Sequence, residues 1–112
     1  MELGGNAPFI VFDDADLDAA IEGAMASKFR NAGQTCVCAN RIFVQSGIMP
    51  RFAKRLAERV AALKVGDGEM ADCQVGPLIN EAGFAKTERL VAQARAAGAK
   101  VLTGGAKHAA GE

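Results

Sequence analysis

The chain has 112 residues, half of which are hydrophobic, and its thirteen basic residues balance thirteen acidic residues. This length suffices for one modest core, and the even charge excludes a basic surface for nucleic acid or for an anionic membrane. No apolar run approaches the ~20 residues that span a bilayer, and the opening residues lack the features of a signal peptide. We therefore expect a cytoplasmic protein that acts on a small molecule.

The cysteines fit neither a disulfide framework nor a metal site. Cys36 and Cys38 flank a single valine, Cys73 lies far along the chain, and the one histidine, His108, is more distant still. Three cysteines are too few for a disulfide scaffold, and this spacing lacks the ligand pattern of a zinc site. The sequence thus predicts no metal.

The first predicted elements are a strand and a helix. Residues 7–12, Ala-Pro-Phe-Ile-Val-Phe, form an apolar run that favours a strand buried on both faces. Nearby aspartates offer N-cap oxygens for a helix that ends at about Asn31, and Gly33 would supply a left-handed turn. These aspartates are Asp13, Asp14 and Asp16, and the apolar helix positions are Leu17, Ala20, Ile21, Ala24, Met25 and Phe29.

Strands and helices alternate along the rest of the chain. Residues 41–45 favour a second strand, and Pro50 suits the first turn of a second helix. Asn80 can cap a third helix that Gly98 ends, and residues 100–105 favour a third strand. This alternation predicts an α/β fold in which helices flank a parallel sheet. The predicted buried positions of the two helices are Met49, Phe52, Ala53, Leu56, Val60, Leu63, Phe84, Thr87, Leu90, Val91 and Ala94.

Two features suggest that the fold is incomplete. Residues 64–79 form an irregular connection that is longer than compact domains usually contain. The chain also begins and ends abruptly, without a closing element at either end. We therefore expect residues 1–112 to be part of a larger domain.

Cys36 is the candidate nucleophile. It lies in the connection before the second strand, where functional side chains are often exposed. The competing interpretation is a buried cysteine that packs as a small hydrophobe, with Cys38 as its companion. A helix C-terminus disfavours a thiolate, so a reactive Cys36 needs a separate base. Glu2 is the candidate base, because Gly4 and Gly5 allow the backbone to approach a ligand, although a solvated terminal acid is the alternative.

The stretch ELGGNAPFIVFDDADLD, followed by GQTC, resembles the aldehyde dehydrogenase superfamily. The two signature segments of that superfamily are a Glu-Leu-Gly-Gly motif and a Gly-Gln-x-Cys motif. The resemblance covers essentially all 112 residues and implies part of a catalytic domain, without the dinucleotide-binding and C-terminal parts. Within the superfamily, residues 6–41 look most like the NAD(P)-dependent succinate-semialdehyde dehydrogenases.

The resemblance implies oxidation of an aldehyde, here succinate semialdehyde, with NAD or NADP as cofactor. Cys36 matches the nucleophile, its amide matches one oxyanion donor, and Glu2 matches the base that activates the deacylating water. Leu3 and Gly4 match backbone that lines the nicotinamide pocket. The second oxyanion donor, an asparagine, comes from a segment outside these residues, so we expect the chain alone to be inactive.

Arg30 is the candidate substrate-binding residue. It lies six residues before Cys36, on the last turn of the predicted helix, and matches the arginine that binds the distal carboxylate of succinate semialdehyde. Its alternative role is to neutralise the helix C-terminus. Arg41 has no such match, and we interpret it as a structural or interface charge. Cys38 is a candidate redox partner of Cys36, although packing is the interpretation that we favour for it.

Two other functions stay open at this point. The chain could be a noncatalytic α/β module for interaction or oligomerisation, or an aldehyde dehydrogenase with a different substrate. For the complete enzyme, the resemblance implies a homo-oligomer.

Overall fold

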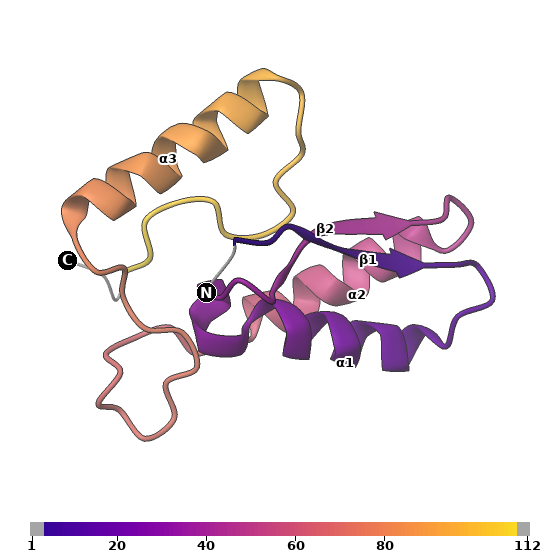
Figure 1. Cartoon of the computed structure of the whole chain (residues 1–112), viewed down its shortest axis with the longest axis horizontal. Helices are drawn as coiled ribbons and strands as arrows, with labels where there is room; N and C mark the ends of the chain where they lie inside the picture. Colours follow the sequence, from indigo (N-terminus) through magenta and orange to yellow (C-terminus); the bar gives the residue numbers. More distant parts are fainter. Residues whose placement is uncertain (1–3, 110–112) are drawn as a thin grey trace. The chain divides into compact units, whose positions relative to one another are not determined.

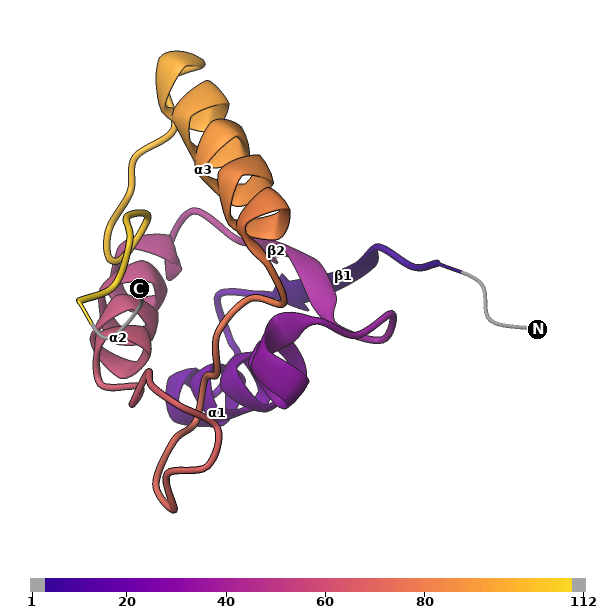
Figure 2. The ribbon, with the colours of Figure 1, turned by 90° about the vertical axis from the view of Figure 1, so that its left-hand side faces the viewer.

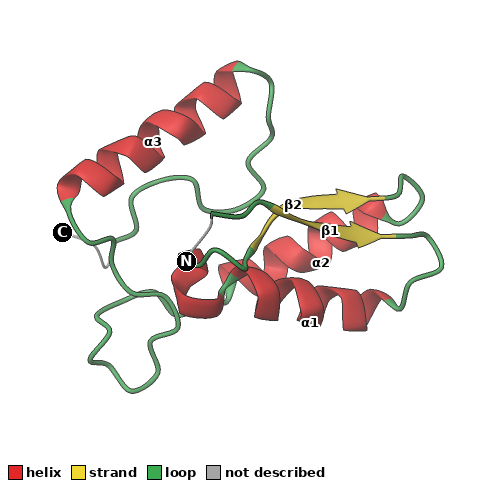
Figure 3. Ribbon diagram, in the orientation of Figure 1, coloured by secondary structure: helices red, strands yellow, loops and turns green. Residues whose placement is uncertain are grey.

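The computed structural model describes residues 4–109, which form two compact units that divide between Ala62 and Leu63 (Figure 1). The second unit contains one helix, α3 (Glu81–Ala96), among its described residues. The first unit contains the other elements, in the order β1 (Ala7–Val11), α1 (Leu17–Lys28), the 3₁₀ turn η1 (Arg30–Gly33), β2 (Ala39–Val44) and α2 (Met49–Ala61) (Figure 3). The predicted alternation of strands and helices is therefore confirmed for the first unit.

The two strands of the first unit form a parallel pair, in which Phe9 lies opposite Ile42 and Val11 opposite Val44. Both helices of this unit lie on the same side of the strands, as two views at right angles show (Figures 1 and 2). A parallel pair with a helix between its strands is the arrangement that the sequence predicts.

The core of this unit lies between the strands and the two helices. Phe9 on β1 contacts α1, because a Cβ atom added to Gly23 would lie 3.5 Å from its ring. The buried hydrophobic residues come from both strands, both helices and the segments that precede β2 and α2. They are Val11, Ile21, Ala24, Met25, Cys38, Ala39, Ile48 and Phe52.

The strands were expected to be buried on both faces, and within residues 4–109 this is wrong. Ile10 and Phe43 are 59% and 52% exposed on the face that points away from the helices. Phe12, which was expected to end the first strand, lies beyond β1 and is 62% exposed. The physical reason is that α1 and α2 cover only the other face.

Asp16 caps α1, whereas Asp13 contacts the residue before α2. The Asp16 carboxylate accepts a hydrogen bond from the Ala19 amide at 3.0 Å, as its N-cap position predicts. The Asp13 carboxylate instead accepts from the Ile48 amide at 2.9 Å, at the start of α2. Its own amide donates to the Gln45 side chain at 2.9 Å. Asp13 therefore joins the end of β1 to the beginning of α2.

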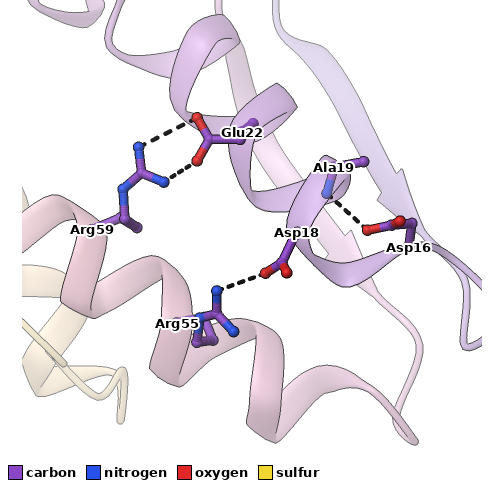
Figure 4. A network of polar contacts seen from close by, with 6 residues as sticks. All are labelled: Asp16, Asp18, Ala19, Glu22, Arg55 and Arg59. Carbon is purple, nitrogen blue, oxygen red and sulfur yellow. Dashed lines mark hydrogen bonds and ion pairs between the residues drawn. The ribbon is translucent and has the colours of Figure 1, made fainter.

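Two ion pairs connect α1 and α2 on the surface (Figure 4). Arg55 pairs with Asp18 at 2.6 Å, and Arg59 pairs with Glu22. All four side chains are about half exposed or more, so each pair adds at most about 1 kcal/mol to stability. The buried apolar side chains therefore contribute more of the stability than these pairs.

The first helix ends earlier than expected, at Lys28 rather than about Asn31, with Phe29 as its C-cap. The chain then takes a left-handed path not only at Gly33 but already at Asn31 and Ala32, whose φ angles are 50° and 55°. Alanine rarely adopts this conformation, which costs roughly 1–2 kcal/mol. The alanine at position 32 therefore gives no sequence signal that the helix ends before it.

The long connection of the second unit has internal order. Lys64 exchanges hydrogen bonds with Gln74, since its amide donates to the Gln74 side chain at 3.0 Å and its carbonyl accepts from the Gln74 amide at 2.9 Å. Lys64 also forms an ion pair with Asp72. The Cys73 thiol donates to the carbonyls of Gly66 and Val75 at 3.3 and 3.4 Å. These contacts explain how an irregular segment of this length keeps a defined shape.

The third helix is confirmed, and the third strand is wrong. Asn80 caps α3 through a 2.9 Å hydrogen bond from the Gly83 amide, and Gly98 follows the helix at a φ of 92°. Residues 100–105 form no strand, because they pair with none of the described residues and a strand exists only beside a partner. The Arg95 side chain donates to the Gly105 carbonyl at 3.2 Å instead.

The predicted apolar stripe of α3 is only partly covered within the described part of the second unit, since Phe84 and Val91 are half-buried and Thr87, Leu90 and Ala94 are exposed. Leu90 is 51% exposed, and no residue of α3 is buried. None of the helices in residues 4–109 is long and apolar enough to cross a membrane.

Candidate active site

Cys36 is exposed in a tight turn directly before β2. The turn is closed by a hydrogen bond from the Cys38 amide to the Thr35 carbonyl at 3.2 Å. The Thr35 hydroxyl also accepts from the Val37 amide at 3.2 Å. Two hydrogen bonds therefore hold the backbone on both sides of Cys36, while its side chain faces the surface.

The left-handed segment before this turn reverses the direction of the chain. The Gln34 amide donates to the Asn31 carbonyl at 3.0 Å, and the Asn31 side chain donates to the Gln34 carbonyl at 3.4 Å. A Cβ atom added to Gly33 would lie only 2.9 Å from the Lys28 carbonyl oxygen. Glycine is therefore required at position 33 both for its φ of 75° and for this close approach.

Cys38 anchors the base of the turn to the end of α1. Its side chain is fully buried, and its thiol donates to the carbonyls of Lys28 at 3.5 Å and Arg30 at 3.9 Å. The next amide, of Ala39, donates to the Ser27 hydroxyl at 3.2 Å. The packing interpretation of Cys38 is therefore consistent with its position. No disulfide joins it to another cysteine of the described residues.

The last glycine of the Glu-Leu-Gly-Gly motif, Gly5, lies against Cys36. A Cβ atom added to Gly5 would lie 2.6 Å from the Cys36 carbonyl oxygen, so only glycine allows this approach. Next in the chain, the Asn6 carbonyl accepts two hydrogen bonds from Arg41 on β2. The structure thus brings the two sequence motifs together at the backbone.

Glu2 and Leu3 lie outside the described residues, so the predicted base and one predicted cofactor contact have no structural description. Gly4 is described and exposed, and a Cβ atom added to it would have no atom within 4 Å.

Arg30 is exposed and begins η1, just beyond the end of α1. The expectation that it lies on the last turn of the helix is therefore wrong, because the helix ends at Lys28. Within residues 4–109, its guanidinium forms no hydrogen bond or ion pair. Its backbone carbonyl accepts a hydrogen bond from the Cys38 thiol at 3.9 Å.

Two features of this site went beyond the sequence analysis. Arg41 was interpreted only as a structural or interface charge, and its contact with Asn6 was not foreseen. The approach of Gly5 to Cys36 was not foreseen either, although a Gly-Gly pair before a strand is a signal for close backbone contact. In the part of the chain that the structure describes, no three His, Cys, Asp or Glu side chains gather to hold a metal ion.

The model of the aldehyde dehydrogenase family matches residues 1–112, which is the whole chain. The chain belongs to the aldehyde dehydrogenase family. Two motifs that this structure brings together, around Gly5 and Cys36, are therefore parts of an aldehyde dehydrogenase catalytic domain.

Curated aldehyde dehydrogenases resemble the chain along nearly its whole length. It is 60% identical over 111 residues to GabD of Escherichia coli strain K12, an NADP(+) succinate-semialdehyde dehydrogenase. It is also 60% identical to a 3-sulfolactaldehyde dehydrogenase of Pseudomonas putida and 58% identical to a glutarate-semialdehyde dehydrogenase of Pseudomonas aeruginosa. Each match covers 99% of this chain and 23% of the relative, so the chain spans about a quarter of their length.

Solved structures of aldehyde dehydrogenases have the same fold over this segment. A succinate-semialdehyde dehydrogenase from Burkholderia pseudomallei superimposes with a TM-score of 0.93 at 61% identity, over 98% of this chain and 23% of that one. A lactaldehyde dehydrogenase from Escherichia coli, at 46% identity, has a TM-score of 0.88 over 94% of this chain and 22% of that one. The predicted fold class, a parallel sheet with flanking helices from an aldehyde dehydrogenase catalytic domain, is thereby confirmed.

Proposed function

We propose that an enzyme of full family length carrying this chain oxidises a short aldehyde with a distal anionic group, using NAD or NADP. Three similar relatives are named for succinate semialdehyde, glutarate semialdehyde and 3-sulfolactaldehyde. Each of these molecules has an aldehyde at one end and a carboxylate or sulfonate at the other. Among them we favour succinate semialdehyde, which would be converted to succinate.

The observation that carries this proposal is the approach of Gly5 to the turn that exposes Cys36. It supports a site in which a thiol from one motif and a carboxylate from the other serve one substrate. Glu2 is only three residues before Gly5, so it belongs to the same short stretch of backbone that approaches the Cys36 turn. The two groups have the chemistry that oxidation through a covalent acyl intermediate requires.

In the proposed reaction, the Cys36 sulfur adds to the aldehyde carbon and forms a thiohemiacetal. The Cys36 amide donates to the oxygen that becomes negatively charged in this step. After the carbon is oxidised, the substrate is held as a thioester on Cys36. Glu2 then takes a proton from a water molecule, whose oxygen attacks the thioester carbon and breaks the carbon–sulfur bond. The proton passes from Glu2 to the departing sulfur, so the acid and the Cys36 thiol are released and the Glu2 carboxylate is restored.

The cofactor would be held only in part by this chain. The backbone of Leu3 and Gly4 would line the nicotinamide, as the resemblance to the family implies. The nicotinamide supplies the hydride acceptor when it is bound. The residues that bind the rest of the dinucleotide would come from other parts of the enzyme, so we expect the isolated chain to show no turnover above that of a Cys36→Ala variant.

Arg30 is the group that we propose for the distal anion. Its guanidinium is exposed and has no partner among residues 4–109, while its backbone is fixed beside the Cys36 turn through Cys38. The planar guanidinium matches a carboxylate or sulfonate with two parallel hydrogen bonds. The alternative role of Arg30, which is to neutralise the C-terminus of the first helix, is less well supported because α1 ends before Arg30.

The test compares Arg30→Leu with Arg51→Leu in an enzyme of full family length that carries this chain. Arg51 is an exposed arginine on α2 and serves as a matched control. We expect Arg30→Leu to lower kcat/KM roughly thirty- to a thousandfold for succinate semialdehyde and to change it little for butanal, which lacks the anion. Arg51→Leu should change neither value. Equal losses for both aldehydes in Arg30→Leu would refute the proposed role.

A further inference from the structure

The Arg41 side chain connects the two motif segments of the candidate active site. Its Nε and Nη2 atoms donate to the Asn6 carbonyl oxygen at 3.2 and 2.8 Å. Asn6 directly follows Gly5, the residue that lies against the Cys36 carbonyl. Two donors of one rigid planar group on a single oxygen restrict the position of that oxygen more than one donor would.

The strand pair is irregular where Arg41 acts. Ala7 lies opposite Ala39, but Pro8 lies opposite Arg41, so the register shifts by one residue of β2 between them. Pro8 has no amide hydrogen to donate, and the Ala39 amide donates to the Ser27 hydroxyl on α1. The hydrogen bonds between β1 and β2 are therefore irregular at the start of β1, and the Arg41 side chain holds the backbone at Asn6 instead.

The Arg41 guanidinium has a second support on its own strand. It lies over the ring of Phe43, with its central carbon 5.8 Å from the ring centroid. Residues 41 and 43 point to the same face of β2, because side chains alternate along a strand. A cation above an aromatic face is attracted by the ring, so Phe43 favours the orientation that reaches Asn6.

From these contacts we propose that Arg41 is a positioning residue, which holds the segment of Gly5 and Asn6 against the Cys36 turn and so supports thioester hydrolysis. Arg41 lies five residues after Cys36, on the strand that continues from its turn, and Asn6 lies four residues after Glu2. One side chain thus connects β2, which follows the Cys36 turn, to the segment that contains Gly5 and Asn6. This inference rests on the proposed function, in which Glu2 serves the hydrolytic step.

The test uses Arg41→Met and Arg41→Lys in an enzyme of full family length that carries this chain, with Arg51→Met as the matched control. Rapid mixing with succinate semialdehyde and NADP measures the burst of reduced cofactor, which counts the molecules whose Cys36 reacts, and then the steady rate. Molecules that fail to fold contribute to neither signal. The ratio of steady rate to burst amplitude therefore reports positioning rather than folding.

We expect Arg41→Met to retain the burst per folded molecule and to lower the steady rate per burst about tenfold or more. Arg41→Lys, with a single charged donor group, should recover part of the rate, and Arg51→Met should behave as the unmodified enzyme. An unchanged ratio in Arg41→Met would overturn the proposal. Glu2→Gln is measured in parallel. If Glu2→Gln slows hydrolysis and Arg41→Met does not, only the proposed role of Arg41 is refuted. If Glu2→Gln has no effect on hydrolysis, the proposed role of Glu2 as the base is refuted.

Discussion

Gly5 and Cys36 lie in such close contact that no side chain fits between them. A Cβ atom added to Gly5 would lie 2.6 Å from the Cys36 carbonyl oxygen and 3.7 Å from its carbonyl carbon. A backbone oxygen cannot swing aside as a flexible side chain can, so any larger residue at position 5 must displace the turn or the segment before β1. This contact couples the position of Gly5, the last residue of the Glu-Leu-Gly-Gly motif, to that of the turn that exposes Cys36.

Gly5→Ala should therefore impair catalysis in an enzyme of full family length. A displacement of several tenths of an ångström or more at a reacting group lowers rates severely, so we expect kcat/KM for succinate semialdehyde to fall roughly ten- to a hundredfold. Steady-state kinetics with saturating cofactor measure this change.

Gly68→Ala is the matched control for this substitution. Gly68 lies in the long connection of the second unit, an added Cβ atom would meet nothing within 4 Å, and its φ is not positive. We expect its kinetics to be unchanged. If Gly5→Ala is as active as Gly68→Ala, the backbone contact with Cys36 is not needed for catalysis.

The local elements were predictable from the sequence because their signals are local. Asp16 and Asn80 cap helices through their own side chains, and Gly98 ends α3 with a positive φ. The pairing of β1 with β2 followed from the rule that parallel strands need a helical crossover. Such features depend on residues that are near one another in the chain.

The sequence could not predict features that depend on distant partners. Residues 100–105 have the composition of a strand but pair with none of the described residues. The end of α1 at Lys28 depends on Ala32 in a conformation that alanine disfavours, held by the contacts of Cys38 with Lys28 and Arg30. The role of Arg41 required knowing that a register shift brings Asn6 within its reach.

Substitutions at Ala32 and Gly33 should change stability in opposite directions. Ala32→Gly removes the strain of a left-handed residue that has a Cβ atom, but glycine gives the unfolded chain more entropy. The net gain in the free energy of unfolding should be about 0.5–1 kcal/mol. Gly33→Ala adds such strain and places a Cβ atom 2.9 Å from the Lys28 carbonyl oxygen, so we expect a loss of about 2 kcal/mol. Thermal unfolding midpoints test the pair, and shifts of the same sign would contradict the left-handed path.

A reversible disulfide between Cys36 and Cys38 stays a prediction, and Cys38→Ala tests it. Hydrogen peroxide would accept the two hydrogens and two electrons that the thiols lose when the sulfur–sulfur bond forms. The Cys38 thiol would first have to leave the carbonyls of Lys28 and Arg30, so closure requires local rearrangement. A disulfide would make peroxide inactivation reversible by dithiothreitol and would make that recovery depend on Cys38, whereas the packing role that we favour for Cys38 predicts equal recovery in Cys38→Ala. Equal recovery in Cys38→Ala would exclude the disulfide.

The measurement that tests the central claim most directly is the identification of the acylated residue in a Glu2→Gln enzyme of full family length. Because Glu2 is proposed to serve only hydrolysis, the variant mixed with succinate semialdehyde and NADP should release one burst of reduced cofactor and retain the acyl group. Tandem mass spectrometry that separates Cys36 from Cys38 should find one succinyl group on Cys36 and none on Cys38 or Cys73. A burst with the acyl group on any other residue, or with no acyl group retained, would contradict the proposed roles of Cys36 and Glu2.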